Sequence, residues 1–281
     1  MIVKEFILLN EEPHTLGLNI KTFFLNGGEC AVIKNFNSLI DSDIINYYNK
    51  LNSVIGKFVP VDLEENTYKC TEHYWTNVKY EFGSDEKQFW RSSNHQNLHT
   101  DNSFAFENYY ANLTQLVCLK PSEYSGNTTL ISNEKVVELI KFNDKNNKLN
   151  MFDKILNKYI YFSVDKCMQI KKPILQFDSL KNKYIFNFNY FPAKRAKNTE
   201  DDIKVVEELN YFLEEKIMCS NMMNEIKLYR GDAIIFNDEL VMHGRRSFLG
   251  TRHYIKSGIN IENLSLINSS IYNVEPIYCK E

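Results

Sequence analysis

Short runs of β-branched and aromatic residues recur along the chain and predict a mainly β protein. Turn-forming triplets, Ser-Gly-Asn at 125–127 and Arg-Gly-Asp at 230–232, separate several of these runs. The strands are expected at residues 29–36, 97–106, 114–120, 127–132, 158–164, 183–191, 232–236, 239–244 and 252–261. Because the runs do not alternate regularly with long helices, a parallel sheet is not expected.

Three other segments carry apolar residues at helical spacing and predict helices. They lie at residues 42–56, 132–142 and 199–218. The last begins with Thr199 and Asp202, the spacing of a capping box. Many short strands with a few peripheral helices predict a jelly-roll or β-sandwich core. Glycines and prolines are spread evenly without a linker, so we expect a single domain over residues 1–281.

Composition excludes several classes of function. The 281 residues carry 33 Lys and Arg against 36 Asp and Glu, a formal charge of −3. This balance gives no electrostatic footprint for nucleic acid or an acidic membrane surface, and we expect neither partner. The six cysteines are scattered without a Cys-x-x-Cys pair, so reduced thiols in a cytoplasmic protein are expected. A P-loop and a G-x-G-x-x-G motif are absent from the sequence.

The first candidate for chemistry is His99-Thr100-Asp101. On a strand, residues i and i+2 project from the same face, so His99 and Asp101 could bind one metal while Thr100 points away. A distant third ligand would complete the facial triad of non-haem iron, two His and one carboxylate with open positions opposite. By itself the motif is weak, since a chain of this composition contains about one by chance. A surface His beside a surface Asp is therefore an equal alternative.

The C-terminal third gives this motif its context. An apolar strand follows the Gly-Asp turn at 231–232, and after a polar break at 237–239 a second strand ends in His243 and Gly244. The next strand would carry Arg252, Tyr254 and Lys256 on one face. An early His-x-Asp, a His far downstream and an Arg on the following strand are much less expected by accident than the motif alone.

Together these stretches resemble the TauD/TfdA superfamily of Fe(II)/2-oxoglutarate-dependent dioxygenases, and within it the clavaminate synthase-like branch. The matching stretches are LHTD (98–101), QLVCL (115–119), GNTTL (126–130), YRGDAIIFND (229–238) and HGRRSF (243–248). The resemblance covers roughly residues 88–260. It implies a double-stranded β-helix, which is a jelly-roll with flanking helices.

The resemblance also implies site residues. His99, Asp101 and His243 would hold the iron. Arg252 would pair with the distal carboxylate of the co-substrate 2-oxoglutarate, a planar bidentate contact that Lys reproduces poorly. Thr129 would give the same carboxylate a hydroxyl.

Some cations near this site leave alternatives open. Arg245 and Arg246 are the alternatives to Arg252 for binding 2-oxoglutarate. Lys256, four residues after Arg252, would face the same side. Arg195 is expected to be a solvated cation, with contact to an anionic substrate group as the less favoured alternative.

The family's chemistry uses O2 and converts 2-oxoglutarate to succinate and CO2. An intact carboxylate at Asp101, where related halogenases have a small residue, favours hydroxylation. We expect the substrate to be a small molecule, a free amino acid or a natural-product intermediate. The alternatives are desaturation or cyclisation by the same chemistry, a metal-binding jelly-roll that senses a ligand without turnover, and a zinc hydrolase.

Overall fold

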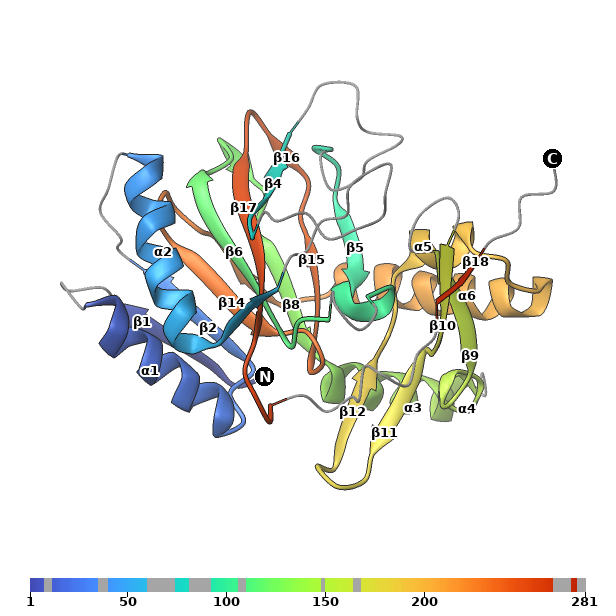
Figure 1. The fold of residues 1–281 in the computed structure, drawn as a ribbon. Coiled ribbons are helices and arrows are strands. Elements are labelled where there is room, and N and C mark those ends of the chain that lie inside the picture. The colour runs from blue at the N-terminus through green and yellow to red at the C-terminus, as the bar shows by residue number, and fades with distance from the viewer. Residues whose placement is uncertain are drawn as a thin grey trace.

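The structure is a computed structural model that describes residues 1–7, 12–34, 40–59, 74–80, 92–105, 110–147, 150–163, 168–264 and 274–276. It confirms the mainly β architecture with flanking helices. Two sheets face each other, one layer of helices covers the larger sheet, and a second layer of helices and strands covers the smaller one (Figure 1).

The larger sheet has the strand order β1-β2-β14-β6-β17-β3, with β4 also paired to β17. Most neighbours in it run antiparallel, and the pair β1 and β2 is parallel. Its strands are β1 (Val3–Ile7), β2 (Cys30–Lys34), β3 (Lys57–Val59), β4 (Thr76–Lys79), β6 (Leu113–Lys120), β14 (Ala233–Asn237) and β17 (His253–Asn260).

The smaller sheet has the order β13-β8-β15-β5 and packs against the larger one. Its strands are β5 (Gln96–His99), β8 (Thr128–Ser132), β13 (Asn224–Ile226) and β15 (Val241–Arg245). A ribbon of β7 (Tyr124–Ser125) and β16 (Phe248–Leu249) lies beside the two sheets. Buried side chains from both sheets, including Leu116, Leu130 and Phe236, fill the space between them. This is the interior of the jelly-roll.

The outer face of the larger sheet is covered by α1 (Pro13–Leu25) and α2 (Asp41–Ile55). The second helix confirms the prediction for residues 42–56 and ends at Gly56. The first helix was not predicted. It contains Gly17, where a Cβ atom would lie 2.8 Å from the Cβ of Val54. The two helices therefore pack too closely for a side chain at that position.

The outer face of the smaller sheet packs against a second layer, in which Leu98, Ile131 and Met242 meet apolar helical side chains. The helices are α3 (Asn133–Asn147), α4 (Met151–Ile155), α5 (Tyr190–Arg195), α6 (Glu200–Phe212) and the π-helix η3 (Leu213–Met218). The strands are β9 (Tyr159–Ser163), β10 (Met168–Pro173), β11 (Leu175–Asp178), β12 (Lys183–Phe186) and β18 (Val274–Pro276). The helix predicted from Thr199 is confirmed, including its capping box with Asp202.

Two of the predicted strands end early. The strand expected over 97–106 stops at His99, and residues 101–103 form the 3-10 helix η2 (Asp101–Ser103). The strand expected over 183–191 stops at Phe186, and α5 begins at Tyr190 with a proline in its first turn. None of the described helices is long and apolar enough to cross a membrane.

Candidate metal centre

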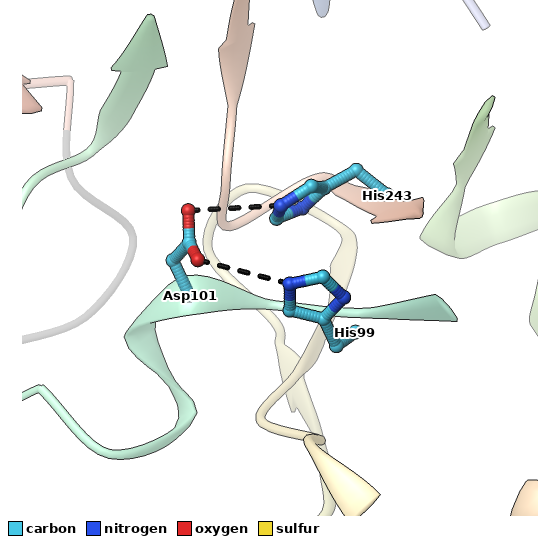
Figure 2. A group of neighbouring side chains, drawn as sticks. All are labelled: His99, Asp101 and His243. Atoms are coloured by element: carbon cyan, nitrogen blue, oxygen red, sulfur yellow. Dashed lines mark ion pairs between the residues drawn. The ribbon is translucent and has the colours of Figure 1, made fainter. Parts of the chain in front are cut away.

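The structure brings His99, Asp101 and His243 together (Figure 2). Strand β15 pairs antiparallel with β5 in a register that sets His243 directly opposite His99, so both rings share one face of the sheet. His99 Nε2 lies 3.8 Å from one carboxylate oxygen of Asp101, and His243 Nε2 lies 3.7 Å from the other. One ligand atom from each residue lies within 4.8 Å of the others, a spacing that one metal ion fits.

Both imidazoles are prepared to act as ligands. Burial lowers the pKa of His99, and it lowers that of His243 still further with help from the neighbouring ring. The neutral form that a metal needs is therefore favoured. His99 Nδ1 lies 2.7 Å from the carbonyl oxygen of Asn97, which fits an Nδ1–H donor and leaves Nε2 with its lone pair facing the centre.

Asp101 supplies the negative charge. Burial alone would raise the pKa of this carboxyl, but the charge and hydrogen bond of Lys256 hold it below its ordinary value. Lys256 Nζ lies 2.7 Å from Oδ1 of Asp101, and the hydroxyl of Thr114 donates to Oδ2 at 3.2 Å. The carboxylate is thus ionised and oriented by groups from β17 and β6.

The triad opens onto a pocket inside the jelly-roll. Its lining is formed by Val78, Gln96, His99, Asp101, Leu116, Thr128, His243, Gly244, Arg245, Arg252 and Lys256. Three of these side chains are cationic, whereas Asp101 is the one carboxylate among them. A pocket with this balance, which a divalent metal would make more positive, fits an anionic ligand.

Arg252 is the cation best placed for such a ligand. It is buried, with 4% of its surface exposed, and its guanidinium carbon lies 3.6 Å from the ring centroid of Tyr254. Burial lowers its pKa, and its Nε has no hydrogen-bond partner. Within the described part of the chain it forms no ion pair with a carboxylate. His253 points to the other side of β17, where it contacts Asn77.

The two alternative arginines are engaged elsewhere. Arg246 pairs with Glu225 and donates to the carbonyl of Met218, and it does not line the pocket. Arg245 does line the pocket, but it donates to the backbone carbonyls of Ser92 and Asn94 at 2.7 and 2.8 Å. These contacts favour Arg252 as the anion-binding residue.

Thr129 does not face the pocket. In the pairing of β8 with β15, Thr129 lies opposite Gly244 and Thr128 lies opposite Arg245. Directly paired residues share a face, so Thr128 turns inward with Arg245 while Thr129 turns outward toward the sulfur of Met218. The expected hydroxyl is displaced by one residue, which inverts the side of the sheet.

Of the remaining predicted residues, some lie at the pocket and others do not. Lys256 faces the pocket as expected from its spacing after Arg252, whereas Arg195 is exposed at the end of α5 and does not line the pocket. Asp101 reaches the centre from the start of η2 and not from a strand. Gln96, whose amide nitrogen lies 3.3 Å from His99 Nε2, was missed. Its position three residues before His99 on the same strand was not a sufficient signal.

An antiparallel jelly-roll with two His and one carboxylate in its interior is the scaffold and donor set of a non-haem iron oxygenase. Residues 59–257 match the family described as taurine catabolism dioxygenase TauD, TfdA family. The chain belongs to this family, so the predicted family and enzyme class are confirmed. The more specific placement in the clavaminate synthase-like branch, and the single domain over 1–281, stay predictions.

Solved structures of other proteins have a similar fold. PvcB from Pseudomonas aeruginosa is 13% identical, with a TM-score of 0.60 over 93% of this chain and 87% of that one. An asparagine oxygenase in complex with Fe(II), 3-hydroxyasparagine and succinate is 14% identical, with a TM-score of 0.61 over 87% and 79%. The non-haem iron oxygenase OrfP with Fe and α-ketoglutaric acid is 12% identical, with a TM-score of 0.58 over 88% and 80%. These likenesses establish the double-stranded β-helix fold. A comparison with curated proteins gives no match.

Proposed function

We propose that this protein is an Fe(II)- and 2-oxoglutarate-dependent oxygenase that hydroxylates an unactivated C–H bond of a small molecule. The observation that carries the proposal is the meeting, in one pocket, of a His-Asp-His triad whose two histidines are buried and a buried arginine without a carboxylate partner among the described residues. A metal site alone would not require the arginine, and an anion site alone would not require the triad.

The donor set fits ferrous iron. His99 and His243 would bind through Nε2 and Asp101 through its carboxylate, all from one side, so the opposite side stays open toward the pocket. Iron with 2-oxoglutarate would supply the oxidising chemistry, in which O2 is consumed and succinate and CO2 are released. The protein's own contribution is to hold these ligands neutral or ionised as required and to exclude water from them.

The co-substrate would be held by Arg252 and Thr128. The planar guanidinium of Arg252 offers two parallel donors to the distal carboxylate, and Tyr254 stacks against it and limits its rotation. Thr128, on β8 of the facing sheet, lines the same pocket, and its buried hydroxyl has no hydrogen-bond partner. This assignment keeps the predicted role of Arg252 and transfers that of Thr129 to its neighbour.

The substrate class follows from the family and the pocket together. Relatives in fold include structures with 3-hydroxyasparagine and with (3S)-hydroxy-L-Arg, both free amino acids. A small anionic or zwitterionic substrate also fits a pocket bordered by Arg245 and Lys256. We therefore propose a free amino acid or a related natural-product intermediate. The buried free thiols of Cys30 and Cys118 fit the predicted cytoplasmic location.

The test has two stages. Fe(II) and 2-oxoglutarate added without oxygen should give the visible charge-transfer band of the chelate. In air, succinate release should then increase when amino acids and their derivatives are screened. A protein that only senses these ligands would give the band without succinate. If neither the band nor succinate appears, the proposed function is wrong.

A further inference from the structure

Two buried ionisable side chains from distant parts of the chain form hydrogen bonds with the backbone around Asp101. Immediately after His99 the strand turns into η2, so Asp101 sits at the start of a tight turn and not within a sheet ladder. Its orientation therefore depends on what holds this turn. The two side chains are Asp238 and Lys172.

Asp238 holds the amide side of the turn. It lies between β14 and β15 with 1% of its surface exposed. One carboxylate oxygen accepts a hydrogen bond from the backbone N–H of Asp101 at 2.9 Å, and the other accepts one from the N–H of Asn102 at 2.8 Å. The same carboxylate lies 3.8 Å from Nδ1 of His243, an atom with no hydrogen-bond partner. Asp238 thus contacts the segments of two of the three metal ligands.

Lys172 holds the carbonyl side. It belongs to β10 in the outer layer and is fully buried, and its ammonium donates to the backbone oxygen of Asn102 at 2.7 Å and to that of Ala105. Lysines are almost never fully buried without compensation. Burial lowers the pKa of Lys172 to about 7, and the negative charge of Asp238 opposes that shift.

The hydrogen bonds of Asp238 and those of Lys172 are complementary. The Asp238 carboxyl group accepts hydrogen bonds from the two N–H groups at the start of the turn, and the Lys172 side chain donates to the carbonyl groups that follow, so the turn is bound at both ends. Apolar residues would pack equally well at buried positions, but they would leave these four backbone groups to find other partners. The geometry fixes the direction in which Asp101 leaves the backbone.

We propose that Lys172 and Asp238 are positioning residues that set the metal affinity of the centre by fixing the Asp101 turn. The proposal rests on the proposed function, because it assumes that the triad binds a metal. It also connects β10, which lies outside the jelly-roll, to the metal centre inside it.

The experiment measures Co(II) binding to the full-length, metal-free protein by its visible absorption spectrum. Three single variants are compared with wild type: Lys172→Met, Asp238→Asn and, as the matched control, Lys171→Met. Lys171 is the neighbouring lysine on β10, but it is exposed and lies over the ring of Tyr161. Variants are used only at temperatures where circular dichroism shows them folded. The double variant Lys172→Met/Asp238→Asn, which changes both side chains together, completes a double-mutant cycle.

We expect the Kd for Co(II) to rise about 10- to 100-fold in each of the two positioning variants, as for other groups that orient metal ligands, and not in the control. The Co(II) spectrum should change as well, because the carboxylate is presented at another angle. A role limited to folding would lower the melting temperature and leave the spectrum and Kd of the folded fraction unchanged. The double variant should lose less affinity than the product of the single losses, since both residues hold one turn.

A Kd within twofold of wild type in folded Asp238→Asn or Lys172→Met would overturn the proposal. So would an equal loss in Lys171→Met. If Lys172→Met does not fold, Asp238→Asn and the double variant decide in the same way. Absence of Co(II) binding by the wild-type protein would instead overturn the proposed function, and this inference with it.

Discussion

The two faces of strands β6, β14 and β17 perform different tasks. Outward-facing residues such as Val117, Ile235 and Ile255 pack with α1 and α2 in an apolar layer. Inward-facing residues of the same strands include Thr114, which binds the Asp101 carboxylate, and Lys256, which pairs with it. Because strand side chains alternate, β6 and β17 contribute to stability on one face and to chemistry on the other, whereas the inward side chains Ile234 and Phe236 of β14 are apolar and fill the interior.

This difference shows why the inner face is more sensitive to substitutions that change charge or hydrogen bonding. The outer face is more sensitive to substitutions that change side-chain volume. Buried charges inside the jelly-roll stay only because they are paired or because a ligand completes them. Apolar side chains outside it depend on close packing. Substitutions that separate these two sensitivities test the comparison.

The largest effect is expected from Asp101→Ala. Among the described residues it removes the one carboxylate that lines the pocket, so turnover and Co(II) binding should both be lost while the protein stays folded. Succinate release and the Co(II) spectrum measure this, with Asp201→Ala, an exposed acid of α6, as the control. Retention of normal metal binding by Asp101→Ala would show that the ligand set is wrong.

A volume change on the outer face comes next. Ile235→Ala should lower the free energy of unfolding by about 2–5 kcal/mol, because a fully buried side chain leaves a cavity against the helices. The apparent KM for 2-oxoglutarate should stay within twofold of wild type at temperatures where the variant is folded. Denaturant unfolding and steady-state kinetics provide the two numbers. A large change in KM would mean that the outer layer also shapes the site.

On the inner face, Arg252→Ala should raise the apparent KM for 2-oxoglutarate about 100-fold, since charged hydrogen bonds contribute about 1.5–3 kcal/mol each. Arg252→Lys should be milder, because the charge is kept and the bidentate geometry is lost. Arg246→Ala, whose partner Glu225 lies outside the pocket, is the control. An unchanged KM in Arg252→Ala would transfer the role to Arg245.

The smallest effect compares neighbours on β8. Thr128→Val should raise the KM for 2-oxoglutarate about fivefold, the loss of roughly one hydrogen bond, while Thr129→Val should leave it unchanged. Valine matches threonine in shape, so only the hydroxyl is removed. The same kinetic assay measures both variants. An effect of Thr129 and none of Thr128 would mean that β8 is shifted by one residue in solution.

Much of the fold could be predicted from local patterns. Helix α2 and the capping box of α6 follow from apolar spacing and from Thr199 and Asp202. Helix α1 was missed because its contact with α2 needs Gly17, which weakens the helical signal in the sequence. The early end of β5 was missed because Asp238, far away in the chain, binds the amides that a strand would have offered to a neighbour.

The sequence by itself determined the chemical types of the site: the His-x-Asp pair, the later His243, and Arg252 on the face it shares with Lys256. These depend on residue identity and on the period-two alternation of strands, both of which are local. Only the tertiary structure decided that His243 lies opposite His99, that Thr128 and not Thr129 turns inward, and that Lys172 and Asp238 grip the Asp101 turn. Those contacts depend on strand register and on burial, which join segments that local patterns cannot connect.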